Sequence, residues 1–167
     1  MDENGLTYDS RRFEPVWDRV LGKGGPNEKE DSLYACLMRF MDDEATDERA
    51  FRSIASRTGG RYRGELLRMA SDEKRWFRRL RTAYFILTGD TYAPEIGQLP
   101  RGGTASALRY MYERERAEAE SYEAAAKAFS RRDVRELFEQ LAEEEKRHAS
   151  EAAAMLENIM DGPPQRR

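Results

Sequence analysis

The chain has 167 residues, 37% of them Asp, Glu, Lys or Arg, and a formal net charge of −3. This length fits one domain with a single core, and the charge does not favour binding to nucleic acid or to a membrane surface. The single cysteine excludes an internal disulfide and a four-cysteine metal site, and no stretch reaches the roughly 18 apolar residues of a membrane span.

Four long helices are predicted after an N-terminal arm. The arm comprises residues 1–28, and the apolar pattern of residues 13–21 predicts a short helix within it that docks on the body. Thr104 is the predicted cap of the third long helix. Glycine and proline residues place the helices at roughly 29–57, 63–88, 105–130 and 132–160, with a non-helical link at 90–103 and a tail at 161–167.

The lengths of the connections predict the topology. Short turns near 59–62 and 130–132 fold the helices into two antiparallel hairpins. The middle link can extend about 45 Å at about 3.3 Å per residue, whereas a helix of about 26 residues is only about 39 Å long. We therefore expect an all-α four-helix bundle over residues 29–160, in which a long crossover joins the two hairpins.

The two hairpins nearly repeat each other in sequence. Residues 70–76 read ASDEKRW and residues 142–148 read AEEEKRH, while Glu44 in the first hairpin aligns with Glu115 in the second. Glu145 and His148 are one helical turn apart, so that both side chains lie on one helix face. Glu73 matches Glu145, but Trp76 stands where the second histidine would be.

A glutamate interrupts the apolar stripe of each helix near its middle. The hairpin geometry predicts that Glu44, Glu73, Glu115 and Glu145 lie at one level of the bundle. Burying one unpaired carboxylate costs at least several kcal/mol, and like charges nearby add to this cost. No lysine or arginine falls on these stripes at that level, so the pattern predicts bound metal. Oxygen ligands with an imidazole suit iron, which we favour, or manganese.

These motifs resemble rubrerythrin and the wider family of ferritin-like di-iron carboxylate proteins. The resemblance covers residues 29–160, and its most specific parts are EKRW at 73–76 and EKRH at 145–148, with Glu44 seven residues before Phe51 and Glu115 seven before Tyr122. It implies a ferritin-like fold and a site for two iron ions.

The resemblance also implies a role for each ligand. Glu73 and Glu145 would bridge the ions, Glu44 and Glu115 would be terminal ligands, and His148 would bind one ion. Trp76 cannot replace the second imidazole, because an indole offers only an N–H donor. In rubrerythrins an extra glutamate can take that place, and Glu118 has the matching spacing. A single ion and an empty site remain alternative outcomes.

The function that the resemblance implies is the reduction of hydrogen peroxide by a di-iron oxidoreductase. Such an enzyme would need an external electron donor, because the cysteine pairs of a rubredoxin module are absent from this sequence. We expect a cytoplasmic homodimer that binds neither nucleic acid nor membrane. The alternatives are a ferritin-like protein that oxidises and stores iron, and a non-catalytic helical module whose metal site is degenerate because of Trp76.

Overall fold

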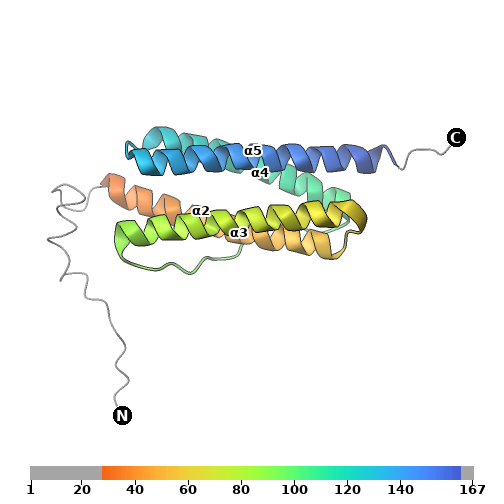
Figure 1. The fold of residues 1–167 in the computed structure, drawn as a ribbon, viewed down its shortest axis with the longest axis horizontal. Coiled ribbons are helices and arrows are strands. Elements are labelled where there is room, and N and C mark those ends of the chain that lie inside the picture. The colour runs from red at the N-terminus through yellow and green to blue at the C-terminus, as the bar shows by residue number, and fades with distance from the viewer. Residues whose placement is uncertain (1–27, 163–167) are drawn as a thin grey trace, which may run out of the picture.

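The computed structural model describes residues 28–162, which form an all-α bundle of four helices with no strand among them (Figure 1). The predicted fold class is confirmed, and each helix bound agrees with its prediction to within three residues. The predicted docking helix lies outside the described residues, as does most of the arm and of the tail. The four helices are α2 (Glu28–Ser56), α3 (Gly60–Thr88), α4 (Thr104–Ala128) and α5 (Arg132–Met160).

The helices pair as two antiparallel hairpins. Short turns at 57–59 and 129–131 connect α2 to α3 and α4 to α5, so that each pair packs along its whole length (Figure 1). Helices α3 and α4 run in the same direction, because the chain returns along the bundle between them. This topology brings the matching segments of the two sequence repeats to similar heights.

The crossover at residues 89–103 lies along α2. Gly89 ends α3 with a φ of 75°, a left-handed conformation that glycine adopts without strain. Asp42 accepts a hydrogen bond from the backbone N–H of Glu95 at 2.8 Å, and the hydroxyl of Thr46 accepts one from the N–H of Gly97 at 2.9 Å. These bonds give the extended link backbone partners that it cannot find within itself.

The predicted capping role of Thr104 is wrong. Gly103 is the cap residue, and Thr104 is already the first residue of α4. Its hydroxyl lies 3.1 Å from the hydroxyl of Thr58, in the turn after α2. Thr104 therefore links the crossover to the first hairpin instead of satisfying the free N–H groups at the start of its own helix.

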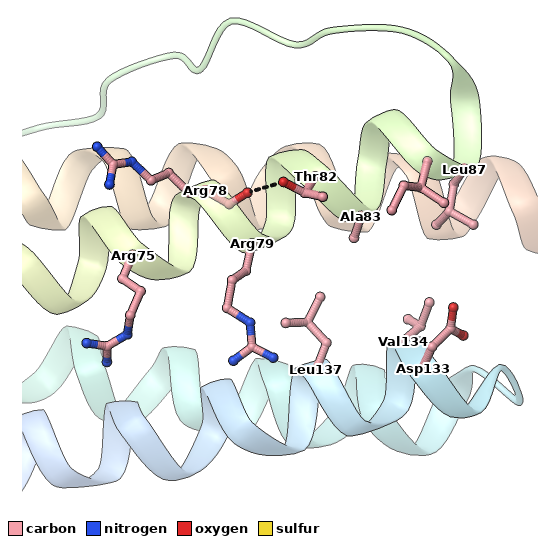
Figure 2. A pocket seen from close by; sticks show the side chains of 10 residues that line it. Arg75, Arg78, Arg79, Thr82, Ala83, Leu87, Asp133, Val134 and Leu137 are labelled. Atoms are coloured by element: carbon pink, nitrogen blue, oxygen red, sulfur yellow. Dashed lines mark hydrogen bonds between the residues drawn. The ribbon is translucent and has the colours of Figure 1, made fainter.

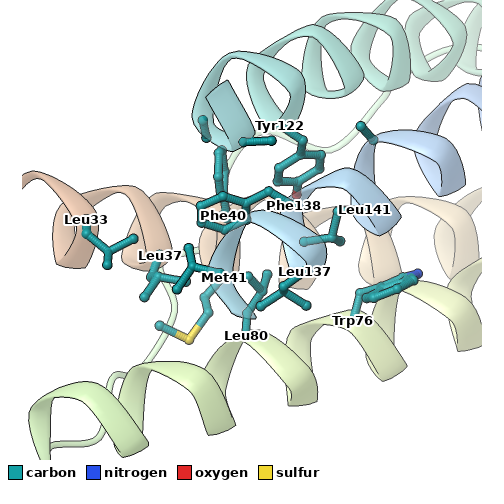
Figure 3. Close-up of a cluster of buried hydrophobic side chains, with 14 of the residues drawn as sticks. Leu33, Leu37, Phe40, Met41, Trp76, Leu80, Tyr122, Leu137, Phe138 and Leu141 are labelled. Atoms are coloured by element: carbon teal, nitrogen blue, oxygen red, sulfur yellow. The ribbon is translucent and has the colours of Figure 1, made fainter. Parts of the chain in front are cut away.

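Two apolar clusters fill the two ends of the bundle. The first lies toward the α4–α5 turn, where the ring of Phe40 packs edge-on against Tyr122 and Phe138 at centroid distances of 4.3 and 5.2 Å (Figure 3). The second lies toward the α2–α3 turn and includes Phe51 and Leu66. Burying each large side chain in this way stabilises the fold by about 1.5–3 kcal/mol relative to leaving it exposed. Both ends are therefore tightly packed, and they shield the layer between them from water.

Candidate metal centre

A layer of buried ionisable side chains separates the two apolar clusters. Each of the four helices contributes two of its members, at positions between its two apolar segments. All of them are less than 9% exposed, a degree of burial that is rare for charged residues unless they are paired. The members are Glu44 and Asp47 on α2, Asp72 and Glu73 on α3, Glu115 and Glu118 on α4, and Glu145 and His148 on α5.

Three carboxylates and one imidazole converge at the centre of this layer. Glu73, Glu115, Glu145 and His148 each offer one ligand atom, and these atoms all lie within 4.8 Å of one another. The Nδ1 atom of His148 is 2.6 Å from Oε1 of Glu73. The same nitrogen is 3.7 Å from a carboxylate oxygen of Glu115 and of Glu145. The structure therefore brings together four of the six predicted ligands from three different helices.

The converging atoms have lone pairs but find no hydrogen-bond partner outside their own group. Within residues 28–162 this holds for Nδ1 of His148, Oε1 of Glu73 and both carboxylate oxygens of Glu115 and Glu145, although Nδ1 of His148 and Oε1 of Glu73 lie close to each other. Buried polar atoms are almost always satisfied, and each exception needs an explanation. A cation at the point of convergence would satisfy all of these atoms at once, so the donor set fits a metal ion.

Burial makes these carboxylates hard to ionise without a cation. It raises the pKa of Glu73 and Glu145 well above the usual value. The charge of Glu145 raises the pKa of Glu73 further, and the charge of Glu115 raises the pKa of Glu145 further. Burial likewise raises the pKa of Glu115 well above its ordinary range. A bound divalent ion reverses this balance, because it favours the charged form of every carboxylate that it contacts.

The opposite edge of the imidazole faces Asp72, a residue that the sequence analysis did not assign to the site. The Nε2 atom of His148 lies 3.6 Å from Oδ2 of Asp72. Arg75 and Arg147 donate hydrogen bonds to Asp72 at 2.7 and 2.9 Å. Burial alone would raise the pKa of Asp72, but these two arginines lower it overall. An anionic Asp72 next to Nε2 favours the tautomer that leaves Nδ1 free to bind a metal.

Glu44 lies at the edge of the central group. Its Oε1 atom accepts a hydrogen bond from the hydroxyl of Tyr122 at 2.5 Å, while its Oε2 atom has no partner among the described residues. Burial raises the pKa of Glu44 well above its usual value, and the nearby charge of Glu145 adds to the effect. Glu44 is thus a buried carboxylate with one oxygen directed by a tyrosine and the other available to a ligand.

Trp76 takes part in packing and not in the central group. Its side chain is 5% exposed and belongs to the apolar cluster near the α4–α5 turn (Figure 3). The guanidinium of Arg79 lies over the indole at 4.3 Å from the ring centroid. Arg79 and Arg75 extend from α3 toward α5, and together with Leu137 and Val134 they line a surface groove that contains none of the converging ligand atoms (Figure 2).

The sequence analysis considered only lysines and arginines on the apolar stripes, but an arginine outside them reaches this level. Arg114 lies beside the apolar stripe of α4, and its guanidinium extends to Asp47 on α2 at 2.6 Å. It also contacts Glu118 at 2.7 Å. Glu118 therefore has a protein cation as its neighbour, together with Asp47, whereas the sequence analysis assigned it to the metal. A residue outside the stripe was overlooked because a long arginine can reach around the helix surface.

A search for related proteins supports the fold alone. No model of a known protein family matches the sequence, and no curated protein matches it. Among solved structures, a hypothetical protein from Pyrococcus furiosus is similar, with a TM-score of 0.69 and 17% sequence identity over 77% of this chain and 90% of that chain. None of the helices in residues 28–162 has a segment long and apolar enough to cross a membrane.

Proposed function

We propose that this protein binds iron in its buried carboxylate–histidine layer and acts as a rubrerythrin-like oxidoreductase that reduces hydrogen peroxide. The observation that carries the proposal is the convergence of Glu73, Glu115, Glu145 and His148, whose ligand atoms have no hydrogen-bond partner outside the group within residues 28–162. Three oxygen ligands with one imidazole form a donor set that suits ferrous iron or manganese. Residues 28–162 contain a buried group of this kind that could hold a metal ion.

The residues offer unequal places to two ions. His148 and Glu115 would hold the first ion together with Glu73 and Glu145. Glu44 would hold the second ion and share Glu73 and Glu145 with the first. Four carboxylates would then balance the charge of two divalent ions. The second place lacks an imidazole because Trp76 is packed among apolar residues, so we expect the first ion to bind more tightly.

The chemistry of the bound ions would be electron transfer. The reduction of one hydrogen peroxide to two waters takes two electrons and two protons, and a pair of bound ferrous ions would supply the two electrons. The protein residues support this in two ways. The apolar clusters on both sides of the layer exclude bulk water, and Tyr122 holds the carboxylate of Glu44 in one orientation through its hydroxyl.

Metal analysis tests the binding part of the proposal. Protein that has been loaded anaerobically with ferrous iron should retain between one and two irons per chain after desalting. Glu145→Gln should remove most of the iron, because it replaces a shared ligand. Glu143→Gln is the matched control on the same helix, because the Glu143 side chain is 74% exposed and pairs with Lys146. Equal iron content in both variants would refute the site.

Peroxide oxidation tests the redox part. Addition of hydrogen peroxide to the anaerobic ferrous protein should oxidise two irons per peroxide and produce the visible absorption of ferric carboxylate complexes. The absence of any spectral change would refute peroxide reduction. It would favour the non-catalytic alternative, in which the site is degenerate because Trp76 replaces the second imidazole. Iron storage predicts instead a hollow multi-subunit shell, which size-exclusion chromatography would distinguish from the expected homodimer.

A further inference from the structure

Arg114 brings a permanent positive charge to the edge of the buried layer. Its side chain is 21% exposed, whereas the side chain of Asp47, which it contacts, is only 2% exposed. The guanidinium contacts Asp47 through Nε at 2.6 Å, Glu118 through Nη2 at 2.7 Å and Asp43 through Nη2 at 3.2 Å. A guanidinium stays protonated in proteins and presents several donors in one plane. It is therefore suited to hold several carboxylates in fixed positions.

The contacts of Arg114 separate the two buried glutamates of α4. Glu115 directs its carboxylate toward His148, with 3.7 Å between the nearest atoms. Glu118, one turn later, pairs with Arg114. Asp47, Glu115 and Glu118 nevertheless offer oxygens that lie within 4.8 Å of one another. Glu118 is thus close enough to the central group to join it, and its pairing with Arg114 is what separates the two.

Charge supports the same division. Glu44, Glu73, Glu115 and Glu145 carry four negative charges when ionised, and two divalent ions would balance them. Asp47 and Glu118 add two further buried carboxylates, for which no metal charge is left. Removing the partner of a buried charge is strongly destabilising, and Arg114 supplies one positive charge that these two carboxylates share.

We propose that Arg114 is a built-in cation that pairs with both Asp47 and Glu118 and thereby keeps Glu118 from coordinating metal. This inference rests on the proposed function, since it concerns the ligands of the same centre. Arg114 is a positioning residue in this scheme. It determines which carboxylates of the layer bind metal and which hold the helices α2 and α4 together.

The first experiment asks whether Glu118 is a ligand, with Mn²⁺ as the probe. Free Mn²⁺ is measured by electron paramagnetic resonance during titration of the metal-free protein. Glu118→Gln should bind the same number of ions as the wild type, with an affinity within about threefold. Loss of a ligand or of its immediate support costs about 10–100-fold, so a decrease of tenfold or more would overturn the inference. Weaker binding in Glu118→Gln alone would overturn only this inference. A wild type that bound no Mn²⁺ would overturn the proposed function together with it.

The second experiment removes the proposed internal cation. Arg114→Gln is compared with Arg109→Gln, which removes the same charge from the same helix at an exposed pair with Glu113. In the metal-free state the Arg114 variant should have the lower melting temperature. Mn²⁺ should raise the melting temperature of the Arg114 variant more than it raises that of the wild type. The reason is that Glu118 and Asp47, once released from Arg114, can bind the ion. Equal melting temperatures of the two metal-free variants, or equal shifts with Mn²⁺ in Arg114→Gln and the wild type, would overturn the inference.

Discussion

The two halves of the sequence repeat place different aromatic rings at the same helical position. His148 follows Glu145 on α5, is fully buried and lies within 4 Å of carboxylates on α3 and α4. Trp76 follows Glu73 on α3, is also buried, and packs in the apolar cluster under the guanidinium of Arg79. Burial is nearly equal at the two positions, but only one of them adds a lone pair to the charged layer.

The comparison shows how one residue can make the two halves of a symmetric centre unequal. Both halves keep their glutamate, so the carboxylates alone do not distinguish them. An imidazole can supply a metal ligand without adding a negative charge, whereas an indole supplies apolar surface in its place. We therefore expect the half with His148 to determine metal affinity and the half with Trp76 to determine how many ions bind.

Removal of the imidazole should have the largest effect. His148→Ala deletes a direct ligand, whereas changes to residues that only support ligands already cost about 10–100-fold. We expect Mn²⁺ affinity to fall by more than about 100-fold, as measured by isothermal titration calorimetry. Trp76→Phe is the matched control, because it changes the other ring while preserving apolar packing, and it should alter the affinity by less than about threefold. Similar losses of Mn²⁺ affinity in both variants would contradict the expectation that the half with His148 determines metal affinity.

Introduction of the second imidazole should have the next largest effect. Trp76→His restores the repeat, so we expect a second ion to bind with an affinity closer to that of the first. The change also removes a buried indole, and truncating such a residue to alanine costs about 3–5 kcal/mol. The metal-free variant should therefore be less stable than the wild type, and Mn²⁺ should recover part of the loss. A Trp76→His variant with the same Mn²⁺ stoichiometry as the wild type and the same affinity for each ion would show that the half with Trp76 gains no ligand from the imidazole.

A smaller effect is expected at Asp72, on the far side of the imidazole. Asp72→Asn keeps the shape of the side chain but removes the charge that faces Nε2 of His148 at 3.6 Å. We expect Mn²⁺ affinity to fall by about tenfold, the lower end of what such supporting residues contribute. Glu144 is the control, since it contacts the same arginines but lies farther from Nε2, at 3.9 Å. Glu144→Gln should therefore weaken binding less than Asp72→Asn does.

The fold was predictable because its signals are local. Glycine residues such as Gly89 interrupt a strong helical pattern, and the lengths of the connections leave few ways to pair four helices. Thr104 was misassigned because two adjacent residues can each begin a helix, and the contact with Thr58 that favours the observed start joins distant parts of the chain.

The candidate site was predictable only where the residues lie on the apolar stripes. Glu73, Glu115, Glu145 and His148 fall on those stripes and meet in the structure. The role of Asp72 was missed, because it depends on which edge of the His148 ring faces α3, and helical periodicity does not specify the orientation of a ring. Arg114 was missed for a related reason, since the helical position of an arginine does not indicate where its guanidinium ends.

The buried glutamates, which both halves of the repeat share, should also control how the stability of the protein depends on pH. Burial raises the pKa of Glu44, Glu73, Glu115 and Glu145 in the folded protein. Groups of this kind stabilise the fold most below the unfolded-state pKa of about 4.3, and the benefit is lost as the pH rises through the raised value. Lowering the pH from about 8 to about 5.5 should therefore raise the melting temperature of the metal-free protein by at least about 3 °C. With saturating Mn²⁺ the trend should weaken or reverse, because protons then compete with the ion for the same oxygens. Calorimetry of both forms would measure the two slopes, and a metal-free protein that lost stability over this range would show that its buried carboxylates are neutralised by something other than protons.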